Sequence, residues 1–546
     1  MLTYSFDNTG SETLYEHLYR CIKEDILSGV IAPDDRLPSK RSLAKNLGIS
    51  VITVENAYGM LSDEGYIYSI PKKGFFAADI AGAAAGLRAD RREAGRGTSA
   101  ADSRLMRTGT GLGTFAPDYR LIRTGTDLGT SAADSRLMRD PRKFRQSPDL
   151  HAPEKEDSGE RTYLADFVSN RTSPDNFPFA TWVRLLREVM RDRKDELLIN
   201  PPPGGIFELR EAICGYLYQF RGIKVLPQQI IVGAGTEYLY SLLIQLLGRD
   251  KKIALETPGY RKIPLIYEKN GVSCRYIPMD AQGIRMNALN ESGCDILHIS
   301  PSHHFPTGIV TPVNRRYELL SWAAESRNRY IIEDDYDSEF RMAGKPIPPM
   351  QSIDTVEKVI YINTFTKSLA STVRIGYMIL PPHLLEKFRS ELGFYSCTVS
   401  NFEQYTLARF LRDGYFEKHI NRMRKFYRNQ RDFLLKHIRT HPLASGIKIT
   451  GEHAGLHFLL HVPTASSDEE IVERADRAGI RISALSQYDF PPGEDPGCSA
   501  EAEHSGRDPV NHTLVVNYSG ISTEVIPEAV DRLIRSIVGE DIAQDH

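Results

Sequence analysis

The sequence predicts two folded domains of different class, a small α+β domain at the N-terminus and a large α/β domain after it. Three helical patterns followed by two short strand-like runs over residues 11–79 predict the first domain. Strands that alternate with helices over residues 161–540 predict the second, and we expect its sheet to be mostly parallel because parallel strands need helical crossovers. A chain of 546 residues is also too long for a single hydrophobic core.

Residues 80–160, between the two domains, are rich in Gly, Ala, Ser, Thr, Asp and Arg and have few large apolar side chains. They contain a tandem repeat with a period of 16 residues, in which SAADSRLMRTGTGLGT (99–114) is followed by FAPDYRLIRTGTDLGT (115–130) and SAADSRLMRD (131–140). Each unit has too few apolar side chains to offset the entropy of ordering the chain. We therefore expect a flexible linker here and not a solenoid.

The overall composition excludes several classes of protein. With 41% hydrophobic and 25% charged residues the chain is typical of globular proteins, and its net charge of −3 means that any DNA contact depends on a local basic surface. The six cysteines are scattered without a CxxC pair, which argues against a disulfide scaffold and against a metal site. The N-terminus does not resemble a signal peptide, and no apolar stretch is long enough to span a bilayer, so we expect a cytoplasmic protein.

The N-terminal domain contains the pattern of a helix-turn-helix. Apolar residues at a spacing of four predict a first helix over residues 12–28. Ser39 can cap a second helix that ends at Gly48, and Ser50 can cap a third. Because the turn at Gly48 is tight, the second and third helices form a helix-turn-helix, whose later helix can enter the major groove of DNA.

Two strand-like runs, YIYSI (66–70) and FFAA (75–78), predict a hairpin wing after the helices. Over residues 1–80 the chain has 8 Lys and Arg against 11 Asp and Glu, so the domain is not basic overall. Its basic side chains nevertheless fall on the second helix, on the approach to it and at the tip of the wing: Arg36, Lys40, Arg41, Lys45, Lys72 and Lys73. This placement favours DNA binding over the alternative, a helix-turn-helix kept as a protein-docking module.

The phrase RLPSKRSLAKNLGIS (36–50) resembles the start of the winged-helix domain of GntR-type regulators, and the resemblance covers residues 12–79. It implies DNA contacts from the second helix, the third helix and the wing, and together with the placement of charges it gives the candidates Arg36, Ser39, Lys40, Arg41, Ser50, Thr53, Asn56, Lys72, Lys73 and Gly74. For Arg36 and Ser39 a structural role is the alternative.

The predicted recognition helix, residues 50–62, departs from the GntR pattern in one respect. It has no Lys or Arg, and Glu55 stands where a basic residue is common in the family. Specific base reading then depends on Ser50, Thr53 and Asn56, which give weaker contacts than an arginine bound to guanine through two hydrogen bonds.

In the large domain, several motifs lie at the ends of predicted strands, where α/β folds bind ligands. The strand IIVGAG (230–235) runs into Thr236 and a helix, and glycines at a helix start expose N–H groups that suit a phosphate. The motif ETPGY (256–260) presents Tyr260, which can stack on an aromatic ring, although a lone tyrosine at such a place is more often a packing residue.

The segment YIIEDDYDSEF (330–340) reads as a buried strand that ends in Asp334, Asp335 and Tyr336. A carboxylate beside a pyridine nitrogen keeps that nitrogen protonated, so that the ring withdraws electrons from a substrate. A phenol next to it can hydrogen-bond a ring hydroxyl. This arrangement suits a pyridine cofactor.

The segment VIYINTFTKSLASTVRIGYM (359–378) delivers Thr364, Thr366 and Lys367, with Arg374 seven residues after the lysine. The lysine amine can form a Schiff base once burial lowers its pKa. The hydroxyls and the guanidinium around it suit a phosphate dianion. The lysine, the preceding acidic motif and the following arginine together make a specific signal.

Taken together, residues 161–540 resemble a fold type I aminotransferase of class I and II, and the whole chain resembles the MocR/GabR family of regulators. The resemblance implies that pyridoxal 5'-phosphate is bound, with Lys367 as its Schiff-base lysine, Asp334 as partner of the pyridine nitrogen and Tyr336 as partner of the ring hydroxyl. Asp335 is an adjacent candidate for the pyridine contact. The resemblance further implies that Tyr260 stacks on the ring and that the phosphate is held by Gly235, Thr236, Thr364, Thr366 and Arg374. The family also implies a head-to-tail homodimer.

The motif PSHHFPTG (301–308) departs from the aminotransferase pattern. It has Phe305 where aminotransferases carry an asparagine, so one amide that would touch the ring is lost. His303 and His304 either compensate for this loss or form a solvent-facing or structural pair.

A second departure lies on the C-terminal strand TLVVNYSGIS (513–522). Val515 stands where many aminotransferases carry the arginine that binds the substrate carboxylate, so bidentate carboxylate binding is lost there. Arg341 is a candidate to replace it. The preceding stretch 489–512 is polar and rich in Pro and Gly, and we expect a surface loop.

These observations predict a DNA-binding transcription regulator that senses an amine, an amino acid or pyridoxal phosphate itself through an internal aldimine at Lys367. Its expected partners are double-stranded DNA and a small-molecule effector. Two alternatives stay open. One is a functional aminotransferase with an accessory helix-turn-helix, which the missing arginine and Phe305 disfavour, so that we expect no physiological turnover beyond partial transamination. The other is a body that binds no cofactor and serves only to dimerise.

Overall fold

The structure is a computed structural model, and it describes residues 4, 14–70, 73–78, 163–169, 172–342, 347–490 and 511–539. We call residues 14–78 the head and residues 163–539 the body. The predicted linker, residues 80–160, lies outside the described residues, as do Lys72 and most of the expected loop 489–512.

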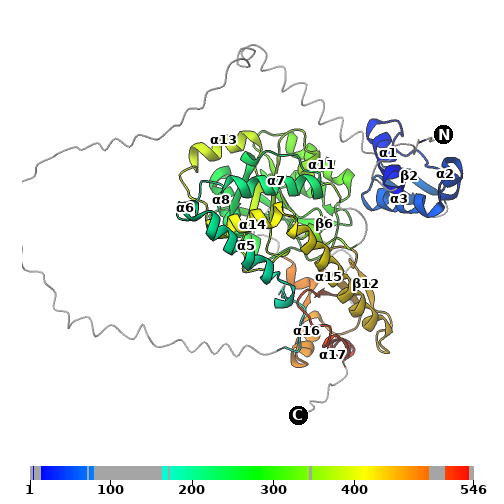
Figure 1. Ribbon diagram of the computed structural model, residues 1–546. Helices are drawn as coiled ribbons and strands as arrows, with labels where there is room; N and C mark the ends of the chain where they lie inside the picture. Colours follow the sequence, from blue (N-terminus) through cyan, green and yellow to red (C-terminus); the bar gives the residue numbers. More distant parts are fainter. Residues whose placement is uncertain are drawn as a thin grey trace, which may run out of the picture. The chain divides into compact units, whose positions relative to one another are not determined.

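The head consists of three helices and a two-stranded hairpin, as the sequence predicts. The elements are α1 (Leu14–Ser28), α2 (Lys40–Leu47), α3 (Val51–Asp63), β1 (Ile67–Ile70) and β2 (Gly74–Ala77) (Figure 1). The two strands are antiparallel, with Tyr68 opposite Phe76. The apolar stripe of α1 is buried at Leu18, Ile22 and Ile26, which pack against α3 to form the core of the head.

Side-chain caps explain where α2 and α3 begin. The hydroxyl of Ser39 accepts a hydrogen bond from the N–H of Ser42, and the hydroxyl of Ser50 accepts one from the N–H of Thr53. Gly48 ends α2 with a φ of 64°, a left-handed conformation that favours glycine. Both predicted caps and the predicted turn are therefore confirmed.

The body is built on an eight-stranded sheet with the order β4-β11-β10-β9-β8-β5-β6-β7. Its strands are β4 (Ile230–Gly233), β5 (Lys252–Thr257), β6 (Ser273–Asp280), β7 (Gly283–Ile284), β8 (Ile296–Ile299), β9 (Tyr330–Asp334), β10 (Val359–Thr364) and β11 (Gly376–Ile379). The pairs β6–β5, β5–β8, β8–β9 and β9–β10 are parallel, whereas β11 is antiparallel to β10 and to β4, and β7 is antiparallel to β6. The predicted mostly parallel sheet is confirmed.

Helices cover both faces of this sheet, because side chains of successive strand residues point to opposite faces. Ile360 and Ile362 of β10 pack with α8 (Thr236–Leu247) and α13 (Pro382–Glu391). Tyr361, between them, packs with α7 (Phe207–Arg221) and α14 (Asn401–Arg412) on the other face. The other helices of this part are α5 (Phe179–Asp192), α6 (Lys194–Leu197), α9 (Lys262–Lys269), α10 (Met286–Glu291), α11 (Val313–Ala324) and α12 (Met350–Ile353). Within the described ranges, none of the helices combines the length and the apolar character needed to cross a membrane.

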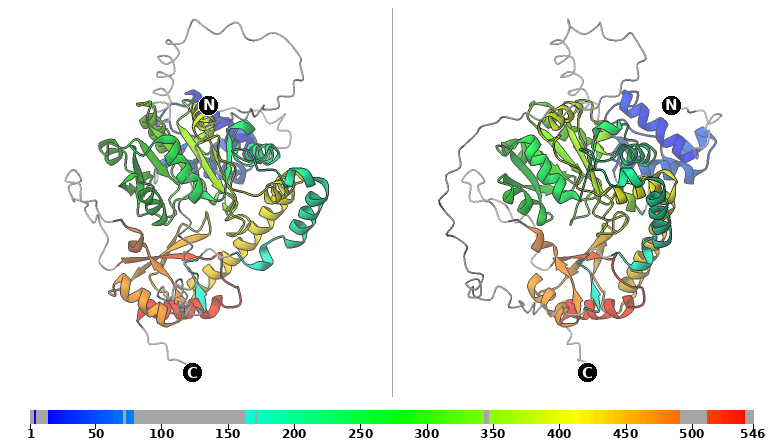
Figure 2. Two further views of the ribbon diagram at one scale, coloured as in Figure 1. Left: turned by 90° about the vertical axis from the view of Figure 1, so that its left-hand side faces the viewer. Right: turned by 60° about the vertical axis from the view of Figure 1, so that its left-hand side comes forward.

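A smaller four-stranded sheet forms the C-terminal part of the body, with the order β12-β13-β16-β15. Its strands are β12 (Lys448–Thr450), β13 (His457–Pro463), β15 (Ser483–Ala484) and β16 (Asn511–Asn517). The long helix α15 (Tyr415–Thr440), yellow in Figure 2, leads to this part and packs against α17 (Ile526–Val538), which also contacts α16 (Asp468–Arg477). The short strand β3 (Ala165–Asp166) pairs in parallel with β14 (Ile480–Arg481), so the first described residues of the body join its last part.

The parallel strands determine where polar side chains collect. Because β5, β8, β9 and β10 run in one direction, their carboxyl ends meet at one edge of the sheet. Glu256, Ser300, Asp334 and Thr364 lie at or directly after these ends. The same edge therefore receives two carboxyl groups, two hydroxyls and the segment that leads to Lys367.

We predict that the packing of α8 on the sheet contributes strongly to the stability of the body. Leu246 of α8 is fully buried, so Leu246→Ala should lower the free energy of unfolding by about 2–5 kcal/mol. The matched control is Leu265→Ala on α9, where the side chain is 55% exposed and the change should stay within about 0.5 kcal/mol. Denaturant unfolding followed by circular dichroism measures both, and equal losses would contradict the prediction.

Candidate functional site

A cavity of about 560 Å³ opens at the carboxyl edge of the large sheet. Eight of the nine residues predicted to hold a cofactor line it: Thr236, Tyr260, Asp334, Tyr336, Thr364, Thr366, Lys367 and Arg374. The ninth, Gly235, borders the same place, because a Cβ on this residue would lie 2.8 Å from a guanidinium nitrogen of Arg374. The structure thus brings together side chains from five separate segments of the sequence.

Lys367 lies three residues after the end of β10 and lines the cavity. Burial lowers the pKa of its amine to about 8, while the nearby carboxylate of Asp337 acts in the opposite direction. A larger fraction of the amine is therefore neutral near physiological pH than for an exposed lysine. Only the neutral amine is a nucleophile.

The structure distinguishes between the two neighbouring aspartates at the end of β9. Asp334 lines the cavity; its Oδ2 accepts a hydrogen bond of 2.5 Å from the hydroxyl of Tyr240, and its buried Oδ1 has no hydrogen-bond partner. The buried Oδ1 of Asp335 also has no hydrogen-bond partner among the described residues, but Asp335 does not line the cavity, and its Oδ2 accepts hydrogen bonds of 2.6 Å each from Arg221 and from the hydroxyl of Tyr361. The geometry therefore favours Asp334 for a ligand contact and gives Asp335 a structural ion pair.

Behind Asp334 lies His298, whose Nε2 is 3.7 Å from Asp334 Oδ2. The other ring nitrogen, Nδ1, is 2.8 Å from the hydroxyl of Tyr267. Sequence reasoning missed Tyr240, His298 and Tyr267, because a single His or Tyr on an apolar helix or strand is usually a core residue. Their contacts fix the orientation of the Asp334 carboxylate.

His303 and His304 are both buried, at 3% exposure each, so the solvent-facing alternative for this pair is wrong. His303 Nδ1 lies 2.8 Å from Asp337 Oδ2 and 3.4 Å from the hydroxyl of Tyr336. His304 Nδ1 lies 2.7 Å from the hydroxyl of Thr307, and burial lowers the pKa of His304 to about 3, so its ring is neutral. His304 lines the cavity, whereas His303 supports Tyr336 from behind.

One end of the cavity combines hydroxyls, a helix start and a guanidinium. Thr364 Oγ1 and Thr366 Oγ1 lie 2.8 Å apart, and α8 begins at Thr236 after Gly235, which has a φ of 86°. Arg374 belongs to the same end, since it approaches Gly235. Exposed N–H groups at a helix start, hydroxyls and a guanidinium are the groups that proteins use to bind phosphate.

A carboxylate that the sequence analysis did not select lies beside Arg374. Glu237 Oε2 accepts a hydrogen bond of 3.2 Å from Arg374, and Glu237 Oε1 accepts one from Lys262. These contacts, that with Lys262 above all, hold the pKa of Glu237 below its ordinary value. An acidic residue in the first turn of a helix is common on dipole grounds alone, so its position in the sequence carries no specific signal.

Another part of the cavity lining is aromatic. The ring of Phe305 lies edge-on to Tyr260 and to Tyr488, at centroid distances of 5.9 and 5.2 Å. Phe490, which also lines the cavity, stacks on Tyr276 at 4.3 Å. Phe305 thus replaces the expected amide with an apolar face.

The arginine that binds the substrate carboxylate in many aminotransferases, and that the sequence analysis found missing at Val515, has no replacement on the described lining. Val515 is buried on β16 between Leu459 of β13 and Ser483 of β15. Arg341 forms a β-bridge with Ala454 and is not among the described residues that line the cavity. The suggestion that Arg341 takes the place of the missing arginine therefore receives no support.

Glu256 is a second acidic residue of the lining that the sequence did not single out. Its Oε2 accepts a hydrogen bond of 3.0 Å from the N–H of Ser300, and burial raises its pKa to about 8. The nearest ring nitrogen is His304 Nε2, at 3.4 Å. A polar residue at the carboxyl end of a buried strand was the signal that could have identified it.

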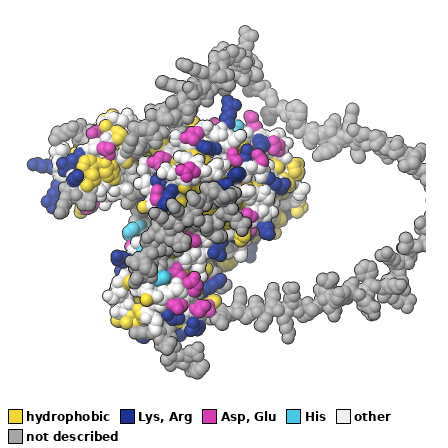
Figure 3. Space-filling model, turned by 180° about the vertical axis from the view of Figure 1, so that it is seen from behind, with side chains coloured by type: hydrophobic (Ala, Val, Ile, Leu, Met, Phe, Trp, Pro, Cys, Tyr) yellow, Lys and Arg dark blue, Asp and Glu magenta, His cyan; other side chains and the backbone are white. Residues whose placement is uncertain are grey.

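The head places its predicted DNA-contacting residues in two groups. Ser39 and Ser50 are caps, and the hydroxyls of Ser50 and Thr53 lie 2.8 Å apart, so these groups have partners within the head. A second group, Arg36, Lys40, Arg41, Asn56, Lys73 and Gly74, is at least partly exposed. Figure 3 shows Lys and Arg side chains next to hydrophobic ones on the surface of the head.

The exposed face of α3 also carries two residues that sequence reasoning did not assign to base contacts. Ile52 is 68% exposed, and Glu55 forms an ion pair of 2.7 Å with Lys40 of α2. Glu55 is thus the departure from the GntR pattern noted above, and the structure pairs its charge within the head. Asn56 lies next to it and is exposed.

Comparison with known proteins gives the same division of the chain. The class I and II aminotransferase family matches residues 168–531, and the gntR family of bacterial regulatory proteins matches residues 14–77. The uncharacterized HTH-type transcriptional regulator YdeL of Bacillus subtilis is 34% identical over 95% of this chain and 96% of its own. The probable rhizopine catabolism regulatory protein MocR of Rhizobium meliloti is 28% identical over 96% of this chain and 94% of its own.

Solved structures resemble the body. The multiple substrate aminotransferase from Thermococcus profundus has a TM-score of 0.59 and 24% sequence identity, over 70% of this chain and 93% of its own. At this identity the likeness concerns the fold, which is that of the fold type I aminotransferases, as the sequence predicts.

We predict that the ion pair between Arg221 and Asp335 holds the wall of the cavity together. Burial raises the pKa of Asp335, but the Arg221 guanidinium and the Tyr361 hydroxyl outweigh burial and hold that pKa below its ordinary value. Arg221→Met keeps most of the side-chain volume and leaves a buried carboxylate without its cation, so the free energy of unfolding at neutral pH should fall by about 3–5 kcal/mol.

The pH dependence of this loss follows from the sign of the pKa shift. A lowered pKa stabilises the fold above the pKa of the unfolded chain, and the stabilisation disappears as the pH falls through the folded value. The difference between Arg221→Met and the wild type should therefore shrink on acidification, as measured by denaturant titrations at several pH values. Arg412→Met, at an exposed arginine of α14, is the matched control, and a loss of the same size there would refute the role of the buried pair.

Proposed function

The chain belongs to the MocR-type family of transcriptional regulators, which join a GntR-type DNA-binding domain to a class I and II aminotransferase domain, and we propose that its body binds pyridoxal 5'-phosphate to sense a small molecule. DNA binding follows from the GntR domain. The observation that carries the proposal is that Lys367, Asp334 and Arg374 line one cavity. We further propose that the protein acts in the cytoplasm.

The residues of the cavity fit this cofactor at both ends. The buried Oδ1 of Asp334 has no hydrogen-bond partner, and a protonated ring nitrogen would supply the missing donor. At the other end, the start of α8 together with Thr364, Thr366 and Arg374 offers donors for a phosphate. Lys367 lines the same cavity, and its lowered pKa of about 8 leaves part of its amine neutral at physiological pH.

When bound, pyridoxal phosphate supplies an aldehyde that reacts with amines and a ring that withdraws electrons. Lys367 supplies the amine that holds the aldehyde, and Asp334 holds a proton at the ring nitrogen. Tyr336, supported by His303, donates a hydrogen bond to the ring hydroxyl. Tyr260, which lines the same cavity, would stack on the ring.

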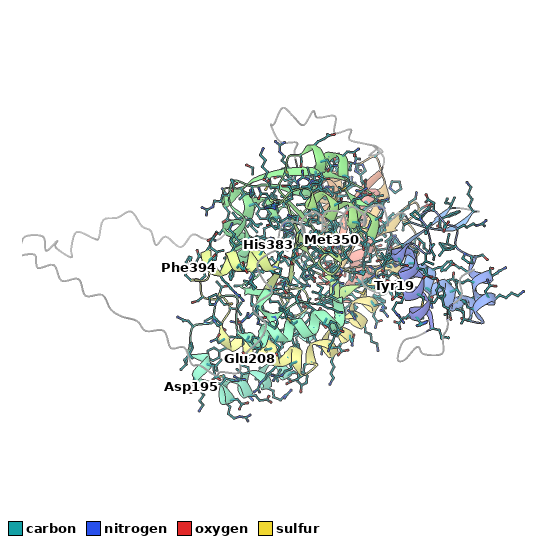
Figure 4. The ribbon with its side chains drawn as sticks, turned by 90° about the horizontal axis from the view of Figure 1, so that it is seen from above. Tyr19, Asp195, Glu208, Met350, His383 and Phe394 are labelled. Atoms are coloured by element: carbon teal, nitrogen blue, oxygen red, sulfur yellow. The ribbon has the colours of Figure 1, made fainter. Side chains whose placement is uncertain are left out.

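Sensing requires that a ligand distinguish two states of the protein. We propose that an effector amine would compete with Lys367 for the aldehyde that the cofactor supplies, and that the state of Lys367 would distinguish the two states of the protein. In a homodimer this change would alter the spacing of the two heads on DNA. Exposed apolar side chains of the body support dimer formation: Phe179, Leu198, Ile199 and Phe394, of which Phe394 is labelled in Figure 4.

A working aminotransferase is the second candidate function, favoured by the joint placement of Lys367, Asp334 and Tyr336. The loss of the amide at Phe305 and of the arginine at Val515 counts against it. Steady conversion of an amino donor to its keto acid, at the rates usual for enzymes, would favour this candidate over a sensor.

We predict that Lys367 is the attachment point of the cofactor. After incubation with pyridoxal phosphate and reduction with borohydride, intact-protein mass spectrometry should show one added cofactor in the wild type and none in Lys367→Ala. The neutral amine reacts, so attachment should be about tenfold faster near pH 9 than near pH 7, given a pKa of about 8.

The control for this experiment is Lys387→Ala, at a lysine of α13 that does not line the cavity. This variant should gain the cofactor like the wild type. Equal labelling of Lys367→Ala and the wild type, or a rate that does not change with pH, would overturn the assignment of Lys367.

We also propose that bases are read by the exposed face of α3, at Ile52, Glu55 and Asn56. An asparagine can bind adenine through two hydrogen bonds, a carboxylate can accept from the amino group of cytosine, and an apolar side chain can contact the methyl group of thymine. Ser50 and Thr53 contribute less to base reading, because their hydroxyls already contact each other. Lys73 at the wing contacts phosphate in this proposal.

We predict two different effects on DNA binding. Asn56→Ala should weaken binding by about 1–3 kcal/mol and relax the preference at one base position, since a base contact is lost. Lys73→Ala should weaken binding to all sequences alike. It should also reduce the slope of log affinity against log salt concentration by about one, because one phosphate contact is lost. Selection from a random DNA library followed by affinity measurements at several salt concentrations tests both, and an unchanged preference in Asn56→Ala would refute its role.

A further inference from the structure

None of the cations on the described cavity lining is available to bind a carboxylate on a ligand. On the described part of the lining they are Lys262, Lys367 and Arg374. Lys262 and Arg374 are both bound to Glu237, and they lie at the end of the cavity that suits a phosphate. Lys367 is the reactive amine. An amino acid in this cavity would therefore find no described cation for its carboxylate.

Many aminotransferases supply that cation from an arginine on the strand that corresponds to β16, and this chain has the buried Val515 at that position. Val515 is 2% exposed, and its strand is hydrogen-bonded on both sides, to β13 and to β15. The Val515 side chain is thus packed inside the protein and offers no cation at this position. A carboxylate on the ligand would face apolar and acidic groups.

Of the carboxyl groups on the described lining, Glu256 and Asp334 have no lysine or arginine partner, and the proposed function assigns Asp334 to the ring nitrogen, which leaves Glu256. It is 8% exposed, and no lysine or arginine among the described residues lies within ion-pair distance of it. Its one neighbour of basic type, His304, is held neutral by burial, which lowers the pKa of His304 to about 3. Burial raises the pKa of Glu256 to about 8, because its ionised form has no cation beside it, and an ammonium group on a ligand would stabilise that form. Glu256 is therefore a candidate ligand group.

The aromatic wall strengthens the same preference. Tyr260, Phe305, Tyr488 and Phe490 line the cavity with ring faces and edges. Ring faces attract ammonium groups, and ring surfaces also pack well against the methylene groups of an alkyl chain. Acidic and aromatic groups therefore favour a cationic, aliphatic ligand.

We propose that the effector is an aliphatic diamine without a carboxylate, whose one amine reacts at the cofactor and whose other ammonium group binds Glu256. This inference rests on the proposed function, because it assumes that the cofactor is bound on Lys367. The reaction exchanges one amine for another at the aldehyde carbon: the bond to the diamine nitrogen forms, the bond to Lys367 Nζ breaks, and the proton of the incoming amine passes to the lysine. No oxidant or reductant is needed.

Three probes of similar length test the proposal: 1,5-diaminopentane, L-lysine, which is the same chain with a carboxylate, and n-pentylamine, which lacks the second amine. Each is titrated into the full-length, cofactor-loaded protein, with affinity measured by calorimetry and by the change in cofactor absorbance. We expect 1,5-diaminopentane to bind about tenfold more tightly than either of the others, since each lacks one favourable feature.

Glu256→Gln isolates the ammonium site. It should remove the advantage of 1,5-diaminopentane over n-pentylamine, while the affinity for n-pentylamine stays within about twofold of the wild-type value. Borohydride trapping of the cofactor on Lys367 shows that the variant remains folded and loaded. The matched control is Glu386→Gln, at an exposed glutamate of α13 outside the cavity, which should leave all three affinities unchanged.

The outcomes separate this proposal from the one on which it rests. Binding of L-lysine as tight as that of 1,5-diaminopentane would overturn the exclusion of carboxylates, and equal binding of n-pentylamine would overturn the role of Glu256. No binding of any probe to a protein that carries the cofactor would overturn the diamine alone. A protein that takes up no cofactor would instead overturn the proposed function.

Discussion

The body depends on the parallel pairing of β5, β8, β9 and β10. The register places Ile362 of β10 opposite Asp334 of β9, so the segments that follow the two strands start at the same height. Consecutive residues at a strand end point to opposite sides, and this alternation sends Asp334 into the cavity and Asp335 to Arg221. A shift of one residue would exchange the two carboxylates, placing the ion-paired group in the cavity and the unpaired one in the core.

The second constraint is the separation of charges within one cavity. Arg374, Lys262 and the start of α8 gather positive potential at one end, and Glu237 partly neutralises it. Glu256 and the aromatic rings make the other wall acidic and apolar. A ligand with a phosphate and an amine is thereby oriented along the cavity, because its phosphate finds cations and N–H donors at one end only.

Much of this arrangement could be predicted from the sequence, because it depends on local patterns. The caps at Ser39 and Ser50 follow from residue type and spacing, and the order of the strands, the lysine and the arginine identifies the large domain. The choice between Asp334 and Asp335 could not be made, since it is decided by Arg221, which lies 114 residues away from Asp335 in sequence.

The carboxylate of Glu237 is another residue that local reasoning could not select. Its partners, Lys262 and Arg374, are 25 and 137 residues away, and no local pattern reports such contacts. The roles of the buried His303 and His304 were left open for the same reason, whereas Glu256 carried a local signal, its place at the carboxyl end of β5, that was not used. Tertiary packing decides whether a charged or polar residue at a strand end faces solvent, a neighbour or a cavity.

The cap at Ser50 has a consequence for how operator recognition evolves in this head. Its hydroxyl fastens the first turn of α3, the turn that would approach the DNA bases, to the N–H of Thr53 at 3.0 Å. Loss of such a cap costs helices about 1 kcal/mol whatever the DNA sequence, because it frays the reading element itself. New operator preferences are therefore accessible through the exposed positions further along α3, whereas changes at Ser50 lower affinity for every operator together.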